Sequence, residues 1–388
     1  MLRLNPLPVV LNKASNRNSG LKAYLRSRMC SKLVNCKSKQ FLLIKKQKKG
    51  KIMEITNFVG IDISKLTFNL ALIIGGNKEN IIDEEFTNDL KGIKQMKKWL
   101  QSSQGIKLDE TVFCMEHTGI YCRTIVDFLV ENKCSVWLEM SVAIIRSMGL
   151  QRGKNDKIDA RRIALYAYKN REDIKLWQAP RKVIVQLRDL LTLRERLIKS
   201  KQSLLVPIKE LRQTGNKQSA GILLKSCKAT IRALEGDIEK VEEQTNQMIK
   251  GDVRLSELFQ LVTSVPGVGK ITAMYLICFT NEFTLYKNAK QLACYCGVAP
   301  FEHSSGTSVI GKPRVSHMAN KILKCNLHLG AMSVIDKIDE FKCYYDRKTK
   351  EGKNKMSVIN AVRNKIIHRV IAVVKRGTPY VNEYKLAV

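Results

Sequence analysis

Residues 57–74, NFVGIDISKLTFNLALII, carry the clearest pair of strand patterns in the chain. The first part, NFVGIDIS, is a short apolar run typical of a core strand, and TFNLALII is a second such run after a tight turn. Asp62 lies between Ile61 and Ile63, so strand alternation places its side chain on the face opposite theirs. A carboxylate buried in a core strand is costly unless something pairs with it, and a metal ion would do so.

The elements that follow predict an α/β domain. After these two runs come a weaker edge strand, NIIDEEFTN, a helix over roughly 90–103, the strand TVFCME, a helix near 121–131, the strand SVWLE, and helices from about 141. Three consecutive strands and then alternating helices and strands describe a mixed sheet with helices on its faces. This order predicts a ribonuclease-H-like domain over residues 53–182.

The rest of the chain predicts two helical parts. Residues 183–250 carry Leu and Ile at heptad-like spacing among charges, which predicts long helices that form an antiparallel pair or a dimerising coiled coil. After residue 250 the composition changes to a mostly helical region with the polar loop FEHSSGTSVIGKPRVS at 301–316. We therefore expect a helical coiled-coil middle over 183–250 and a mainly α-helical C-terminal domain over 251–388.

The charge balance predicts a polyanionic partner. Among 388 residues, 68 are Lys or Arg and 35 are Asp or Glu, which gives a formal charge of +33. Self-repulsion of this size destabilises a compact fold unless a polyanion offsets it, so nucleic acid is the expected partner. A solvated basic surface or a contact with acidic lipid is the alternative. No apolar run could span a membrane and no signal peptide opens the chain, which predicts a cytoplasmic, nucleoid-associated bacterial protein.

Residues 1–52 form a basic extension with 14 Lys or Arg and no Asp or Glu, and the remainder of the chain still carries +19. The extension is either a disordered basic arm that touches nucleic acid, or sequence upstream of a true start at Met53. We favour the second interpretation, because MEITNFVGIDISK begins like the N-terminus of a compact α/β domain.

Four acids predict a metal site. Glu116 closes the strand TVFCME, and Asp156 and Asp159 in RGKNDKIDARRIA are three positions apart, on one face of a helix. Together with Asp62 they could gather around two Mg²⁺ ions that act on a phosphodiester. The basic residues around Asp156 and Asp159 would contact the phosphate backbone of the nucleic acid on either side of the reacting phosphodiester: Arg152, Lys154, Lys157, Arg161 and Arg162. As alternatives, Asp156 could be an N-cap, Asp159 a helix-dipole partner and Glu116 a surface residue.

Three features of the C-terminal part supply further candidate functional residues. SVPGVGKITA, residues 264–273, is either a turn whose backbone around Gly267, Gly269 and Lys270 faces a phosphate, or only a tight helix connection. In CGVAPFEHSSGTS the hydroxyl of Ser305 could approach a phosphate, although the segment could also be a flexible linker. Basic residues near the C-terminus are expected to position phosphates, or to form a solvated helix face: Lys353, Lys355, Arg363, Lys365, Arg369, Lys375 and Arg376.

From about Met53 to about Tyr384 the chain resembles the transposases of insertion sequence family one-ten, which are described as bridge-RNA-guided recombinases. The resemblance rests on GIDISK, EHTGIY and KNDKIDARRIA, which carry the four acids, and on SVPGVGKITA, LACYCGVAP, SSG and the EGKNK…AVRNK tail. It implies a RuvC-like DEDD domain with Mg²⁺ at the four acids. It also implies a nucleophilic serine at Ser305, with Ser304 as its neighbour, that forms a covalent link to DNA at a site completed by a partner subunit.

The resemblance further implies dimerising helices and a structured RNA that pairs with target and donor DNA. In one place the chain departs from the family pattern. Where the family commonly has GNxxLR, this chain reads MANKILK, with Ala319 before Asn320 and Lys324 in place of Arg. Lysine lacks the bidentate fork that arginine offers to phosphate, which predicts weakened activity of this copy.

Together, the residues and the resemblance predict a DNA transposase that moves its own insertion sequence by strand exchange. Its expected partners are double-stranded DNA at the element ends and target, a guide RNA, and further copies of the chain in a dimer or tetramer, with no membrane partner. Two alternatives remain: a metal-dependent nuclease or Holliday-junction-type resolvase without a covalent intermediate, and a non-catalytic nucleic-acid-binding scaffold.

Overall fold

The structure, a computed structural model, describes residues 55–148, 155–286, 288–305 and 309–381. The chain divides into two compact units, Met1–Ala179 and Pro180–Val388, and each is described by itself. Within the described ranges, no helix is long and apolar enough to cross a membrane.

A five-stranded mixed sheet forms the centre of the first unit, in the order β3-β2-β1-β4-β5. β1 pairs antiparallel with β2 and parallel with β4; β2 and β3 are antiparallel, and β4 and β5 parallel. The predicted mixed sheet is therefore confirmed, with the strands of residues 57–74 at or next to its middle. The strands are β1 Asn57–Ile63, β2 Thr67–Ile73, β3 Ile81–Thr87, β4 Thr111–Glu116 and β5 Ser135–Glu139.

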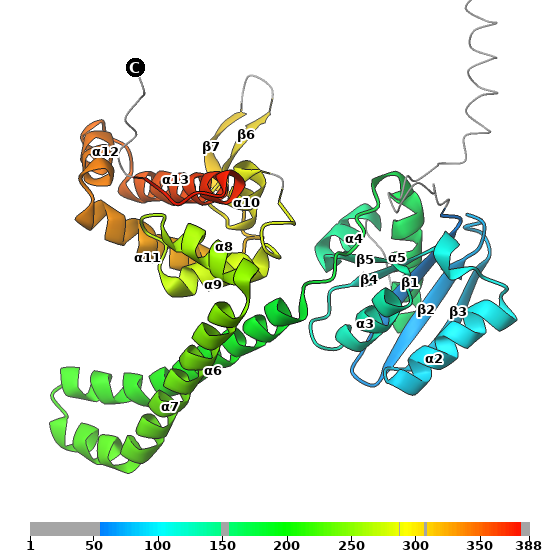
Figure 1. The fold of residues 1–388 in the computed structure, drawn as a ribbon, viewed down its shortest axis with the longest axis horizontal. Coiled ribbons are helices and arrows are strands. Elements are labelled where there is room, and N and C mark those ends of the chain that lie inside the picture. The colour runs from blue at the N-terminus through cyan, green and yellow to red at the C-terminus, as the bar shows by residue number, and fades with distance from the viewer. Residues whose placement is uncertain (1–54, 149–154, 287, 306–308, 382–388) are drawn as a thin grey trace, which may run out of the picture. The chain divides into compact units, whose positions relative to one another are not determined.

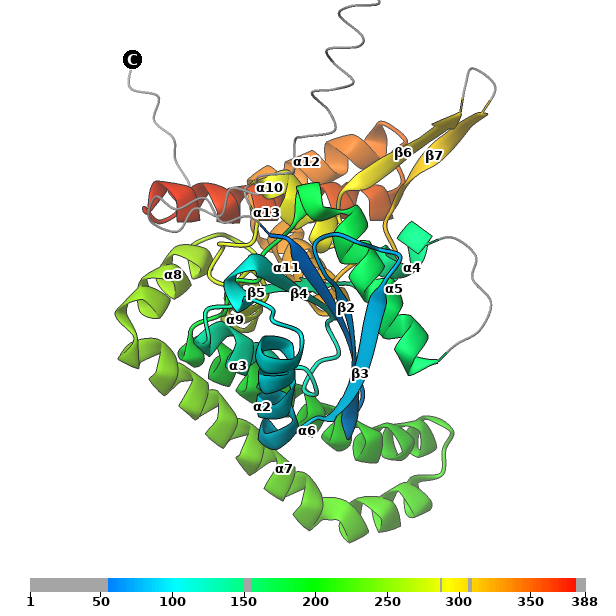
Figure 2. The same cartoon turned by 90° about the vertical axis from the view of Figure 1, so that its right-hand side faces the viewer.

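Helices cover both faces of this sheet (Figures 1 and 2). One core joins the sheet to α2 and α3 through residues such as Ile61, Met96 and Leu129. The other joins it to α4 and α5 through residues such as Phe58 and Ile163. Strands buried on both faces explain why the sequence reads as continuous apolar runs. The helical elements are α2 Leu90–Lys98, continued by a π-helical turn at Trp99–Ser103, then α3 Arg123–Glu131, α4 Ser141–Met148 and α5 Asp156–Lys169, with short 3₁₀ turns at Leu108–Glu110 and Arg171–Asp173.

Two long helices open the second unit, α6 Lys182–Gln213 and α7 Lys217–Gly251. They form an antiparallel hairpin, held by ion pairs at 2.7 Å between Arg194 and Glu242 and at 3.5 Å between Lys201 and Glu235. Pro207 lies inside α6, where it lacks a backbone donor and bends the helix. Figure 1 shows the end of the hairpin turning away from its stem. Coiled-coil association through these helices remains a prediction.

The rest of the second unit packs helices around one core. α9 is its centre, since Thr272–Cys278 are all buried. Leu327 and Ala331 of α11 and Val362 and Ile366 of α13 belong to the same core. These helices are α8 Val253–Thr263, α9 Lys270–Phe279, α10 Ala289–Tyr295, α11 Lys321–Lys337, α12 Asp339–Lys350 and α13 Lys355–Arg376.

The polar loop expected at 301–316 is instead a two-stranded hairpin, β6 Pro300–Ser305 and β7 Val309–Val315. The expectation was wrong because a ribbon with little core to bury needs no apolar alternation, and Gly311 and Pro313 masked the second strand. Phe301, the apolar residue that begins the motif, is half exposed.

An ion-pair cluster fixes the start of α6 to the rest of its unit. Arg181 donates to both carboxylate oxygens of Asp252 at 2.7 and 3.0 Å, and to Glu282 at 2.6 and 2.9 Å. Glu282 is buried and also lies 3.3 Å from Arg254. Asn281, Glu282 and Phe283 all have positive φ, at 47°, 55° and 61°. Such backbone persists only where surrounding contacts hold it.

Candidate active site

Close packing of α5 on β1 positions the acids of the first unit. A Cβ atom at Gly60 would lie 2.2 Å from the backbone N of Ala164 and 2.3 Å from the carbonyl O of Ala160. Only glycine therefore lets the helix lie this close to the strand. The first turn of α5 carries Asp156 and Asp159, so this contact brings both toward the end of β1, where Asp62 lies.

Glu116 joins them from the neighbouring strand. β1 and β4 are parallel, and Ile61 pairs with Met115, so Asp62 and Glu116 lie level at the same edge of the sheet. Asp62, Glu116, Asp156 and Asp159, here called the four-acid cluster, thus come from three elements of one unit.

The charges of the cluster act on one another. Burial first, and then the carboxylates of Asp159, Asp156 and Glu116 in that order, together raise the pKa of Asp62 to about 6. A half-buried group of like charges is a place where a cation would be favoured, because its charge offsets both the desolvation and the repulsion.

The side chains of the cluster have individual partners. Ser141 Oγ donates to Glu116 Oε2 at 2.6 Å, and Arg162 Nη1 donates to Asp159 Oδ1 at 2.6 Å. Asp156 is not the N-cap of α5, because that role belongs to Asn155, whose side chain accepts from the backbone N of Lys157 at 3.1 Å. The capping alternative for Asp156 is therefore wrong, and its carboxylate is exposed.

The donor chemistry of the cluster fits Mg²⁺, which prefers carboxylate oxygens. Its placement is looser than a ligand shell, since among the described residues no three His, Cys, Asp or Glu side chains are grouped as metal ligands would be. The observation that favours a cation is the raised pKa of Asp62, not a preformed coordination geometry.

A fifth acid, Glu139, was missed in the sequence. It ends β5 level with Glu116, and its Oε2 accepts from Tyr166 Oη of α5 at 3.1 Å. Burial is the larger cause that raises the pKa of the Tyr166 hydroxyl and of the Cys114 thiol, and the charge of Glu139 is the next. The signal was present, because SVWLE and TVFCME both end in Glu and parallel strands bring their carboxyl ends together.

The predicted phosphate contacts near the cluster differ in their surroundings. Arg161 forms an ion pair with Asp83 of β3, and Arg162 pairs with Asp159. Lys157 is exposed. Arg152 and Lys154 lie outside the described residues, so the structure does not place them.

Ser305 is the last residue of β6, and its backbone pairs with Val309 across the hairpin. The base of the hairpin is tied to α13, because Asn360 Nδ2 donates to the carbonyl O of Val298 at 2.7 Å. Gly306 lies outside the described residues. Ser305 thus belongs to the two-stranded sheet of the second unit, and the acids belong to the first unit with its five-stranded sheet.

The glycines of SVPGVGKITA have a packing role. Gly267 has a φ of +85°, and a Cβ at Gly330 of α11 would lie 2.0 Å from the carbonyl O of Gly267. The turn and α11 therefore meet backbone to backbone, which favours the tight-connection interpretation at this glycine. Gly269 and Lys270 are exposed at the start of α9.

The basic residues of the C-terminal tail do not share one solvated face. Lys365 Nζ lies 3.8 Å from the ring centroid of Tyr344, and Arg369 donates to Glu340 at 2.6 and 2.8 Å. Arg363 is buried, although the sequence suggested a surface position. The remaining members are exposed, namely Lys353, Lys355, Lys375 and Arg376.

The segment that departs from the family pattern has structural contacts. Asn320 caps α11 through the backbone N of Leu323 at 3.0 Å and donates to Tyr295 Oη at 3.0 Å. Ala319 and Lys324 lie beside Gly297, where an added Cβ would be 2.3 Å from Ala319 Cβ and 3.5 Å from Lys324 Cδ.

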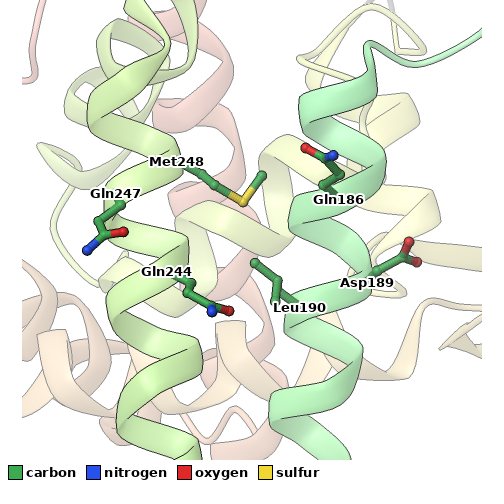
Figure 3. Close-up of a pocket in the computed structure, with 6 residues that line it drawn as sticks. All are labelled: Gln186, Asp189, Leu190, Gln244, Gln247 and Met248. Carbon is green, nitrogen blue, oxygen red and sulfur yellow. The ribbon is translucent and has the colours of Figure 1, made fainter.

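A pocket of about 440 Å³ lies between α6 and α7. Leu190 and Met248 point into the space between the helices (Figure 3). Its other lining residues are polar, namely Gln186, Asp189, Gln244 and Gln247. It contains none of the predicted site residues.

Known proteins share both halves of this arrangement. A transposase family model of the DEDD, IS110 type matches residues 59–212, which include the four-acid cluster. A second model, described as the transposase IS116/IS110/IS902 family, matches residues 259–346, which include the β6–β7 hairpin.

Individual relatives agree with these matches. A pilin gene-inverting protein of Moraxella bovis is 27% identical over 328 residues, 83% of this chain and 97% of that protein. An uncharacterized protein of insertion element IS110 from Streptomyces coelicolor is 29% identical over 159 residues, 41% of this chain and 38% of that protein. The transposase of insertion sequence element IS1111A from Coxiella burnetii is 26% identical over 205 residues, 47% of this chain and 55% of that protein. With a family match in each of its two compact units, the chain belongs to the IS116/IS110/IS902 family of transposases.

Proposed function

We propose that the chain is a recombinase that excises and inserts its own insertion sequence by DNA strand exchange. The observation that carries the proposal is the convergence of Asp62, Glu116, Asp156 and Asp159, whose charges act together on Asp62, within the region matched by the transposase model. The formal charge of +33 supports a DNA partner. The name of the pilin gene-inverting relative also describes a rearrangement of DNA.

The four-acid cluster, on a sheet whose order is compatible with a RuvC-like ribonuclease-H fold, would hold Mg²⁺. Bound there, the ions would neutralise phosphate charge and stabilise a leaving oxygen. The chain's own residues prepare this site in two ways. Gly60 lets α5 approach β1, and Ser141 orients Glu116 through a 2.6 Å hydrogen bond.

Ser305 is the proposed nucleophile. Its hydroxyl oxygen would lose its proton and form a new bond to a DNA phosphorus atom while the bond from that phosphorus to a deoxyribose oxygen breaks. The released deoxyribose oxygen would take up a proton and leave as a free hydroxyl, and the phosphate end of the strand would stay attached to the protein. In the backbone, Ser305 is the last residue of β6 in this two-stranded ribbon.

Trapping of the covalent link tests the proposal. Reacted, end-labelled DNA is run on a denaturing gel with the unaltered chain, with Ser305→Ala and with Ser304→Ala as the matched neighbour. We expect label on the protein for the unaltered chain and for Ser304→Ala, and none for Ser305→Ala, while DNA binding of all three stays similar.

The same gel separates the rival activities. Cleaved DNA without any protein-linked label in the unaltered chain would identify a metal-dependent nuclease or junction resolvase, in which water attacks the phosphate. Adducts that persist in Ser305→Ala would remove this serine from the reaction.

Guidance by a structured RNA and assembly into a dimer or tetramer are further parts of the proposal. If base pairing with RNA supplies the sequence specificity, the protein needs no set of side chains that reads base edges. We expect a discrete RNA from the element to copurify with the chain, and recombination to stop after ribonuclease treatment. Recombination that survives complete removal of RNA would contradict guidance.

A further inference from the structure

Arg363 of α13 is a buried cation with no acidic partner among the residues that the structure describes. It is 6% exposed, and it and Glu282 are the two charged residues buried in the described part of the chain. Glu282 contacts Arg181 and Arg254, so its charge is compensated. Arg363 contacts a histidine instead.

The hydrogen bonds of Arg363 leave donors unused. Its Nη2 lies 2.6 Å from His328 Nδ1 of α11. Arginine only donates, so Nδ1 is the acceptor and the neutral imidazole carries its proton on Nε2. Burial and then the charge of Arg363 lower the pKa of His328, which agrees with a neutral ring. Nε of Arg363 is buried with no hydrogen-bond partner among the described residues.

Within the described ranges, the two helices that meet at Arg363 supply no compensating negative charge. α13 contains six basic residues and no Asp or Glu, and in α11 the single acid, Asp336, lies next to the C-terminal end. Burial lowers the pKa of Arg363, and only the thiol of Cys325 acts in the opposite direction. A guanidinium taken out of water with a neutral partner is costly, so a cation kept in this state indicates a missing anion.

The surface of α11 is open to solvent about one turn before His328. Cys325 lies three residues before His328, on the same face of α11, and it is exposed. An anion could therefore approach the pair along the surface at Cys325, next to the basic side chains of α13.

We propose that Arg363 and His328 bind one phosphodiester group of the DNA backbone. Arg363 supplies the charge and the free N–H donors, and His328 fixes the guanidinium through Nη2. The proposal rests on the proposed DNA strand exchange and adds a positioning site to it.

The position of the pair separates this phosphate from the one that is attacked. Asn360 lies about one turn before Arg363, and its side chain donates a hydrogen bond to the carbonyl O of Val298, two residues before β6 begins. Ser305 lies five residues along β6 from Pro300, about 17 Å away for an extended strand. The phosphate at Arg363 therefore flanks the reacting one and fixes the duplex at the base of the hairpin.

Arg363→Met in the full chain tests this assignment, because methionine keeps much of the stem and removes the charge. A binding role predicts a melting temperature equal to or above that of the unaltered chain, since no uncompensated charge remains buried. It also predicts affinity for duplex DNA about tenfold weaker, with the slope of log affinity against log salt smaller by about one. Arg232→Met, at an exposed position of α7, is the matched control, and we expect its affinity to change less than about twofold.

The possible results separate the explanations. A lower melting temperature with an unchanged salt slope would show that Arg363 is structural and would overturn the proposal. A loss of DNA affinity in Arg363→Met no greater than that in Arg232→Met would also overturn the proposal. Duplex RNA of the same sequence is measured in parallel, and a loss confined to RNA would overturn the assignment to DNA. The two proposals can fail separately. If DNA binding is weaker in Arg363→Met but the unaltered chain forms no covalent adducts, the phosphate site at Arg363 is supported and the proposed serine reaction is rejected.

A measurement on the unaltered chain serves if Arg363→Met does not fold. Cys325 and Cys343 are both exposed, on α11 and α12 respectively. Saturating duplex DNA should slow alkylation of Cys325 roughly tenfold by blocking access, as read by mass spectrometry of the peptides, while Cys343 changes less than about twofold. Equal alkylation of Cys325 with and without DNA would overturn the proposal.

Discussion

Asp62 combines partial burial with three like charges, and these raise its pKa to about 6. The ordinary pKa of an aspartate carboxyl, taken here for the unfolded chain, is 3.8. The folded state therefore disfavours the charged form, so the stability that the neutral carboxyl gives is present below about pH 4 and is lost as pH rises through about 6.

Asp62→Asn should remove this pH dependence. In EDTA at pH 7.5 we expect the variant to be more stable than the unaltered chain by about 1–2 kcal/mol, after allowance for solvent screening of a half-exposed group. At pH 4 the two should be nearly equal. Urea unfolding at the two pH values measures the difference, with the exposed Asp173→Asn as control. A difference that is independent of pH would contradict the interaction among the acids.

At neutral pH, magnesium should make the unaltered chain more stable than Asp62→Asn. Mg²⁺ that binds the folded state stabilises the unaltered chain and leaves Asp62→Asn unchanged. An equal effect of Mg²⁺ on both chains would place the ion elsewhere.

Individual residues differ in how well the sequence could place them. Asp62 stood out because an acid interrupts an apolar strand. Arg363 did not, although it lies four residues after Ile359 and three before Ile366, on the helical stripe that faces the core. Its basic neighbours suggested a surface position. The same spacing rule, applied without regard to residue type, would have placed it correctly.

At the scale of elements, the packing of α5 against β1 decides whether the cluster forms. Gly60→Ala would push a methyl group into the backbone of Ala160 and Ala164. We expect a loss of about 3 kcal/mol in the free energy of unfolding, because neither backbone can retreat without disturbing the sheet.

Gly236→Ala supplies the matched control. This glycine lies within α7, with nothing within 4 Å of an added Cβ, so the change should stabilise the helix by up to about 1 kcal/mol. Thermal unfolding of the two variants measures both effects. A Gly60→Ala chain as stable as the unaltered one would refute the close contact.

The elements themselves followed from the sequence where burial was complete. The strands of the first unit were predictable because a sheet covered on both faces requires apolar runs, and the long helices because their Leu and Ile spacing persists over several turns. The β6–β7 hairpin was not, since strand pairing between backbones leaves little trace in a polar sequence. The convergence of Glu139 with Glu116 depends on strand order, which the sequence does not state.

For the whole molecule, the division at Ala179 and Pro180 leaves the first unit with both of its cores and all four acids. A fragment of residues 53–179 should therefore fold alone. Circular dichroism should show a cooperative transition, and the carboxyl of Asp62 should still titrate near pH 6 by NMR. A fragment without cooperative unfolding would mean that the second unit is required for the fold of the first.

The contact at Gly60 also bears on synthesis of the chain. Gly60 and Ala164 touch across more than a hundred positions of sequence, so a nascent chain cannot close this contact until α5 has left the ribosome. Asp62 and Glu116 are translated early, yet they gain the acids of α5 only when that helix docks. A prematurely terminated product that lacks α5 would keep two isolated carboxylates on an uncovered sheet.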